Sequence, residues 1–360
     1  MTTPPAPAWP GTAWPSAAAT GVGSLPGTDA DEAVRLVLEA LPDFPHLPEL
    51  PNRGGGADMI GRSAAVLSDL HVDAQPSGWR LLPGGAGAGR DERRADDFLR
   101  RDLDALEEAA DGYVGPLKLQ LTGPWTLAAA IELPKGGPVL LDPGATRDVT
   151  DALADGLVAH LAEVGTRVPG AQLFLQLDEP GLPAVLAGHV PTPSGFSVVP
   201  AVEESDALDR LQTALSAGTA AGAVVGVHCC APAPPLRLLH AAGAAFLSFD
   251  VTAAAGEVDL DAVGEAVEAG IRLVAGVLPG TGAVDRAAHE TGTLEKMSDP
   301  ARTVEPIRRL WRRLGFAPET LGESVSVSVS CGMAGATPAY AQAAMRAVHQ
   351  AAHLLADDPT

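Results

Sequence analysis

The residue types best suited to hold a metal ion lie at the end of one apolar segment, VVGVHCCAP at positions 224–232. Side chains alternate between the two faces of a strand, so His228 and Cys230 would share one face and Cys229 the other. A third cysteine, Cys331, follows a second apolar segment further along the chain. Imidazole and thiolate are ligands that zinc prefers. The pattern predicts a zinc site of His228, Cys230 and Cys331; the alternative is that the cysteines are small core residues.

Polar side chains recur on one face of several apolar segments. In QLFLQLDE, which begins at residue 172, alternation places Gln176 and Asp178 on one face and the leucines on the other. The same alternation groups Lys118, Gln120 and Thr122 in one further segment, and Ser248 and Asp250 in another. A buried polar group is costly unless it is paired. These faces therefore indicate either a functional site or a hydrogen-bonded network that fixes the register of the core.

The elements that must position these residues alternate along the chain. The predicted strands are residues 20–24, 46–49, 117–122, 172–178, 223–229, 245–250, 272–277 and 324–330. The predicted helices are residues 29–41, 95–110, 146–168, 203–221, 235–242, 260–269, 300–314 and 338–355. Alternating strands and helices form parallel sheets, and eight such pairs make a closed barrel.

We therefore predict an α/β protein with one (β/α)8 TIM barrel domain over residues 19–360. Such barrels carry their active sites at the carboxyl ends of the strands, where the polar faces described above end. A doubly wound open sheet is the main rival. The sequence GVGSLPG after residue 20 does not fit the G-x-G-x-x-G pattern of a dinucleotide site, which disfavours that rival.

The overall composition argues against several classes of protein. The formal net charge of −21 is unsuited to binding the phosphates of nucleic acid. Three cysteines in 360 residues make no disulfide framework and favour a reducing compartment. Neither a secretory signal nor a run of about 20 apolar residues is present. We expect a cytoplasmic protein with no nucleic-acid or membrane partner, and a flexible tail at residues 1–18, which are rich in Pro and Ala.

The motifs form a series that resembles a known family. In order they are GVGSLPGT, PELPNRGGGADMIG, LTGPWTLA, LQLDEPGL, VHCCAP, LSFDV and VSVSCGMAG. This series resembles the catalytic, C-terminal barrel of cobalamin-independent methionine synthases, over nearly the whole chain. In that family His, Cys, Glu and Cys hold zinc. The resemblance implies that His228, Cys230 and Cys331 bind zinc here, with Asp250 at the position of the glutamate; aspartate is a shorter but acceptable zinc ligand.

The same resemblance implies a substrate and a set of residues that bind it. Homocysteine would be methylated on its thiol, which zinc converts to the nucleophilic thiolate. Its amino-acid end would be held by Ser24 with the backbone of Gly23, by Glu49 and by Asp178. Each side chain also has a structural interpretation. Ser24 could be a turn residue, Glu49 a solvated loop charge and Asp178 the N-cap of the next helix.

The methyl donor is the part that the resemblance leaves open, between methylfolate and a methyl-corrinoid. Full-length relatives have a second, N-terminal barrel, which 360 residues are too few to contain. Residues 275–284, where the family has a catalytic histidine, contain none; Asp285 and His289 are the nearest groups that could supply a proton. A departing pterin needs that proton and a departing corrinoid does not. We therefore expect faster transfer from a methyl-corrinoid, with a corrinoid protein as partner.

Two other functions are compatible with the same residues. One is a decarboxylase of the uroporphyrinogen decarboxylase superfamily, which is disfavoured because it needs no cysteine-bound zinc. The other is a non-catalytic barrel that binds zinc or thiols. An assay of methionine formation with several donors would separate the last from a methionine synthase.

Overall fold

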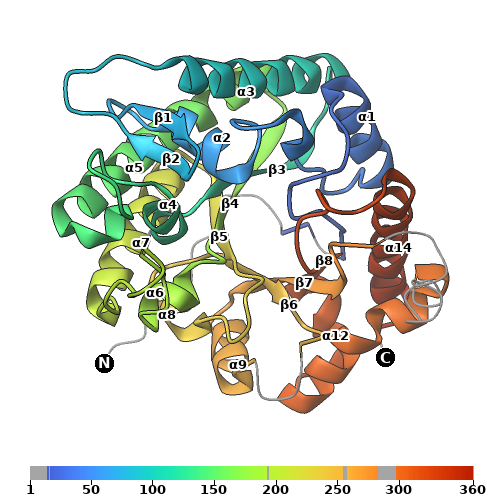
Figure 1. Cartoon of the computed structure of the whole chain (residues 1–360). Coiled ribbons are helices and arrows are strands. Elements are labelled where there is room, and N and C mark those ends of the chain that lie inside the picture. The colour runs from blue at the N-terminus through green and yellow to red at the C-terminus, as the bar shows by residue number, and fades with distance from the viewer. Residues whose placement is uncertain (1–13, 16, 193, 254–257, 283–296, 360) are drawn as a thin grey trace.

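The computed structural model describes residues 14–359 except residues 16, 193, 254–257 and 283–296. Six parallel strands form the central sheet, and each is hydrogen-bonded to the next in chain order. They are β3 (Gly115–Thr122), β4 (Ala171–Asp178), β5 (Val224–His228), β6 (Phe246–Asp250), β7 (Arg272–Leu278) and β8 (Val325–Val329). Helices surround this curled sheet (Figure 1). The predicted α/β class with a parallel sheet is thus confirmed.

Helices connect the strands and cover the outside of the sheet. The longer ones are α1 (Ala30–Ala40), α2 (Met59–Val66), α3 (Arg90–Ala109), α5 (Pro143–Arg167), α7 (Glu204–Ala220), α9 (Leu260–Glu268), α12 (Pro300–Leu314) and α14 (Pro338–Asp357). Shorter turns of helix are η1 (Pro51–Arg53), α4 (Pro124–Ala130), η2 (Val139–Leu141), α6 (Leu182–Leu186), α8 (Leu236–Ala241), η3 (Pro318–Thr320) and α13 (Leu321–Ser324). All eight predicted helices are present. In the described part of the chain, no helix is long and apolar enough to cross a membrane.

The first two predicted strands, residues 20–24 and 46–49, are not strands in the structure. Single parallel bridges instead join Ala19 to Val327 of β8 and His46 to Lys118 of β3, and a third joins the two segments to each other at Ser24 and Glu49. The physical reason is local sequence, because Pro45 and Pro48 lack the N–H that a continuous ladder requires. The prediction of eight strands is therefore wrong. The segment from residue 18 to residue 49, here called the bridged segment, spans the gap between β8 and β3.

A small antiparallel hairpin was not predicted at all. It consists of β1 (Val72–Gln75) and β2 (Gly78–Leu81) and lies outside the parallel sheet. Its turn sits at Pro76 and Ser77, and Gly78 adopts a positive φ of 134° that disfavours other residues. The hairpin lies between α2 and α3 in the chain and contacts α3 (Figure 1).

Capping residues fix where several helices begin. Asp142 accepts hydrogen bonds from the backbone N–H groups of Gly144 (2.8 Å) and Ala145 (3.1 Å), and Pro143 occupies the first turn of α5. Thr337 accepts from Tyr340 N at 3.2 Å at the start of α14. Such caps satisfy N–H groups that have no partner within the helix. They define the short loops that link the strand ends to the outer helices.

The end of the predicted flexible tail is packed against the sheet. Trp14 is 6% exposed and its ring lies 5.8 Å from that of Phe174 and 6.1 Å from that of Phe44. Ala18 is buried as well, and its carbonyl accepts a hydrogen bond from Val327 N. The boundary at residue 18 was thus placed too late, because one large aromatic side chain anchors a segment of otherwise weakly packing residues. Residues 1–13 lie outside the described part of the chain.

Candidate metal centre

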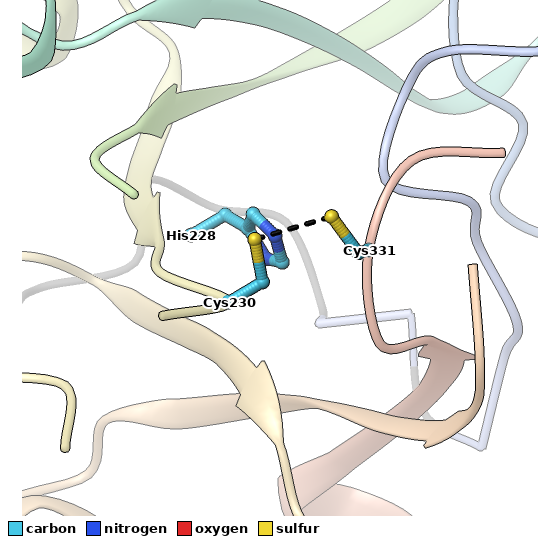
Figure 2. Close-up of side chains that lie close together, drawn as sticks. All are labelled: His228, Cys230 and Cys331. Atoms are coloured by element: carbon cyan, nitrogen blue, oxygen red, sulfur yellow. Dashed lines mark hydrogen bonds between the residues drawn. The ribbon is translucent and has the colours of Figure 1, made fainter. Parts of the chain in front are cut away.

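His228, Cys230 and Cys331 come together at the carboxyl end of the sheet. His228 is the last residue of β5, Cys230 lies two residues beyond it, and Cys331 lies two residues beyond the end of β8. The two Sγ atoms are 3.2 Å apart, and the ligand atoms of all three residues lie within 4.8 Å of one another. Figure 2 shows His228 and Cys230 pointing toward Cys331. We call these three residues the His–Cys cluster.

One ring nitrogen of His228 lies within hydrogen-bond distance of a side chain, and the other has no such neighbour among the described residues. Nδ1 lies 2.9 Å from Ser248 Oγ on the neighbouring strand β6. Nε2 is buried and has no hydrogen-bond partner in the part of the chain that the structure describes. A buried acceptor without a partner is costly. When a histidine binds a metal, its other ring nitrogen normally makes a hydrogen bond, as Nδ1 does here with Ser248. The environment of His228 therefore fits a metal ion bound at Nε2.

The two thiols strongly influence each other. The pKa of Cys331 is lowered to about 4, first by its hydrogen bond with Cys230 and then by the side chain of His228. The pKa of Cys230 is raised above its ordinary range, because losing its proton would remove that hydrogen bond and place two thiolates side by side. One proton is thus shared between two sulfur atoms. A cation between them would replace that proton and favour both thiolates.

Asp250 does not join the His–Cys cluster. Its Oδ1 accepts hydrogen bonds from Thr252 N at 2.7 Å and from Thr252 Oγ1 at 2.6 Å, in the turn after β6. Within the described chain, the metal-competent group at this end of the sheet contains His228, Cys230 and Cys331 without Asp250. The structure thus brings three of the four predicted ligands together, and a role of Asp250 in binding the metal stays a prediction. Three protein ligands with an open position are typical of catalytic rather than structural zinc.

Two buried carboxyl groups lie beside the cluster. Asp178 ends β4 and pairs in register with His228, and Glu49 belongs to the bridged segment; both are nearly inaccessible to solvent. Burial raises the pKa of Asp178 well above its ordinary value, and the neighbouring Glu49 raises it further. Burial likewise raises the pKa of Glu49. Two carboxyl groups crowded in this way would gain most from a cationic ligand between them.

Lys118 provides the counter-charge already present in the interior. It is fully buried on β3, and its Nζ donates a hydrogen bond to Val22 O at 2.8 Å. Burial lowers the pKa of Lys118 to about 8, against the opposing effect of Asp178 and Glu49. The alternation of polar residues in 117–122 was the sequence signal for this residue, although no role could be assigned to it.

The residues Gly23 and Ser24 lie against the loop that carries Cys331. Met333 N donates to Ser24 O at 2.8 Å. A Cβ at Gly332 would come within 2.2 Å of Ser24 Oγ, so only glycine allows this approach. The structure therefore brings the four predicted substrate-binding residues to the same end of the interior as the His–Cys cluster.

Glu179, next to Asp178, binds the start of a different helix, α4, which follows β3. It accepts hydrogen bonds from Trp125 N (2.9 Å), Thr126 N (2.8 Å) and Thr126 Oγ1 (2.7 Å) at the start of α4. Burial nevertheless raises the pKa of Glu179 to about 7. Asp178 does not cap the helix that follows it, because α6 begins with no side-chain cap. Its Oδ1 instead accepts from Gln176 Nε2 at 2.7 Å.

Comparison with known proteins finds likeness in structure but not in sequence. No family model and no curated protein matches the chain. Among solved structures, a B12-independent methionine synthase from Shewanella sp. W3-18-1, in complex with selenomethionine, matches with a TM-score of 0.55 and 11% identity. The match covers 95% of this chain and 98% of that chain. The chain therefore shares the fold of that enzyme.

Two other matches are too distant to carry an argument. An uncharacterised protein matches with a TM-score of 0.29 and 12% identity, over 72% of this chain and 68% of that chain. An amidohydrolase matches with a TM-score of 0.28 and 14% identity, over 67% of this chain and 60% of that chain.

Proposed function

We propose that this protein is a zinc-dependent methyltransferase that moves a methyl group to the thiol of homocysteine and so forms methionine. The observation that carries the proposal is the His–Cys cluster with two buried carboxyl groups beside it. A thiol-binding metal and an ammonium-binding pair of carboxyl groups match the two ends of one small amino acid. In this proposal the bridged segment takes the place of two strands of an eight-membered barrel, and the enzyme works in the cytoplasm as a single barrel.

His228, Cys230 and Cys331 would hold the zinc ion. Bound there, zinc would lower the pKa of the substrate thiol and keep its sulfur as a thiolate. Ser248 would keep the proton on His228 Nδ1, which directs the Nε2 lone pair toward the ion. Asp250 leaves the remaining coordination position to the substrate.

Asp178 and Glu49 would bind the ammonium group of homocysteine. Burial raises the pKa values of both groups, so two carboxylate charges are disfavoured there, and a bound ammonium would relieve this. Ser24 Oγ and the backbone at Gly23 would bind the substrate carboxylate. The structural neighbour, which shares this fold, was solved with selenomethionine, a close analogue of methionine, and this supports an amino acid of that size.

The proposed methyl donor is a methyl-corrinoid, presented free or by a corrinoid protein, with methylfolate as the alternative. The support is in residues 275–284, which contain no histidine to protonate a departing pterin. Missing acid catalysis would slow transfer from methylfolate by about 10²–10⁴-fold. Asp285 and His289, the nearest alternative acids, lie outside the described residues.

A donor-by-acceptor activity matrix on protein of known zinc content tests this function. We expect methionine to form from homocysteine, faster with methylcobalamin or a methylated corrinoid protein than with methylfolate. If methylfolate supports turnover and no methyl-corrinoid does, the proposed donor is wrong, while the proposal that homocysteine is the methyl acceptor still stands. No methionine from any donor, in protein that holds one zinc per chain, would contradict the enzymatic function and favour a non-catalytic zinc barrel.

A further inference from the structure

A second group of metal-competent side chains lies on the outside of the molecule. It consists of Asp43, in the connection after α1, and of His349 and His353 on α14, here called the Asp–His cluster. The next residue after Asp43 is Phe44, which packs on Phe174 near the amino end of β4. The Asp–His cluster is therefore at the opposite end of the strands from Cys230 and Cys331.

The geometry of the two histidines suits a shared ion. Residues four apart on a helix lie on one face, and His349 Nε2 and His353 Nε2 are 3.2 Å apart. Two nitrogens each about 2.1 Å from one zinc ion lie about 3.4 Å apart at the tetrahedral angle and about 3.0 Å apart at a right angle. The observed separation falls between these values.

Hydrogen bonds within the protein satisfy this group only in part, since the two Nε2 atoms bond to each other and not to Asp43. His349 Nδ1 is buried and has no hydrogen-bond partner in the described part of the chain. It lies 3.8 Å from Asp43 Oδ2, and His353 Nε2 lies 3.6 Å from the same oxygen. Both separations are too long for a hydrogen bond. One ligand atom from each residue nevertheless lies within 4.8 Å of the others, close enough for all three to bind one ion.

We propose that the Asp–His cluster binds one divalent transition-metal ion, such as zinc or nickel. Two imidazoles and one carboxylate are suitable ligands for these ions, and Asp43 supplies a negative charge. The side chains of His353 and Asp43 are 60% and 52% exposed, so an ion can enter and keep water ligands. The formal charge of −21 on the chain also favours cations.

Such an ion would connect two distant parts of the chain. His349 and His353 belong to the last helix, whereas Asp43 lies within the bridged segment, just before its bridge at His46. Because the ion would bind only when these parts are docked, it would raise the melting temperature of the protein. This proposal does not depend on the proposed enzymatic function.

Metal titration of untagged protein tests the second site. A Cys230→Ser, Cys331→Ser chain removes the thiols of the first site, and equilibrium dialysis with Zn²⁺ or Ni²⁺ should then give about one ion per chain. Even the loss of a group that only orients a ligand weakens metal binding about 10–100-fold, so adding His349→Ala and His353→Ala should cost at least that much. The same two changes should abolish the metal-dependent rise in melting temperature. His189→Ala, an exposed histidine elsewhere, is the matched control and should change neither.

The proposal is overturned if the chain without the two thiols binds no ion, or if His349→Ala and His353→Ala leave binding unchanged. Should the cysteine variant fail to fold, the unmodified chain serves instead. It should bind two zinc ions, and the His349→Ala, His353→Ala chain should bind one. Equal zinc content in those two proteins would again overturn the second site, whatever the methyl transfer activity.

Discussion

Two regions that are held together in different ways meet at the His–Cys cluster. Strands β3–β8 pair through ladders, with one register shift between β7 and β8, whereas the bridged segment is attached by isolated bridges. The strand region supplies His228 and Asp178 directly and places Cys230 and Cys331 just after strand ends. Ser24 and Glu49 come from the bridged segment. A ladder fixes the direction of every side chain along it, because a shift of one residue turns each side chain to the other face.

Side chains replace the missing ladder in the bridged segment. Lys118 Nζ and Gln176 Nε2 both donate to Val22 O, at 2.8 and 2.9 Å, and Gln120 Nε2 donates to Leu47 O at 2.6 Å. The inward polar faces of β3 and β4 therefore serve as scaffold as well as site. Because all three metal ligands come from the strand region, we expect metal binding to depend on that region. Binding of the amino-acid substrate should depend on both regions.

The largest expected effect is complete loss of zinc from the strand region. The measurement uses a chain that carries His349→Ala and His353→Ala and so lacks the Asp–His cluster. Adding Cys331→Ser removes one of the three ligands of the His–Cys cluster, so we expect zinc content to fall from about one per chain to near zero. Elemental analysis after dialysis measures it. Cys229→Ala is the matched control, because Cys229 packs in the core, away from the cluster, and zinc should remain. Stoichiometric zinc in the Cys331→Ser protein would remove that residue from the site.

Lys118→Met should separate the two regions. Val22 O loses a donor, and two buried carboxyl groups lose their cation, so we expect the free energy of unfolding to fall by about 3–5 kcal/mol. Zinc content should equal that of the unmodified protein, while homocysteine binding weakens. Urea denaturation measures the free energy of unfolding, and calorimetry measures homocysteine binding. Lys135→Met, at an exposed lysine, is the control. Loss of zinc together with binding would show that the two regions are not separable.

A pH titration of stability examines the strand region itself. Glu179 has a folded pKa of about 7 against an ordinary value of 4.5, so the folded protein binds this proton more tightly than the unfolded chain does. The resulting stabilisation is fully present below pH 4.5 and is lost as pH rises through 7, by about 3 kcal/mol. Glu179→Gln should flatten the pH dependence of the unfolding free energy over this range. Equal slopes in both proteins would show that Glu179 is ionised throughout.

The same contrast explains what the sequence could predict. Apolar alternation was sufficient for strands β3–β8 and for the shared face of His228 and Cys230, because both follow from local backbone geometry. Residues 20–24 and 46–49 look like strands locally, but their pairing depends on prolines and on hydrogen bonds from distant side chains. That Asp250 binds Thr252 and lies outside the His–Cys cluster could not be read from the sequence, because it depends on the conformation of the turn after β6. The spacing of His349 and His353 is visible in the sequence, whereas their proximity to Asp43 is a tertiary contact.

The smallest expected effects come from removing the charge of one carboxyl group in each region, Asp178 in the strand region and Glu49 in the bridged segment. If Asp178 and Glu49 grip the same ammonium group, Asp178→Asn and Glu49→Gln should each weaken homocysteine binding by about 1.5–3 kcal/mol, the range for a hydrogen bond to a charged group. Neither change removes a ligand of the His–Cys cluster, so zinc content should equal that of the unmodified protein. Calorimetric titration of the zinc-loaded variants with homocysteine measures both effects under the same conditions. A loss with Asp178→Asn and none with Glu49→Gln would mean that the bridged segment only closes the pocket, and that the strand region alone holds the substrate.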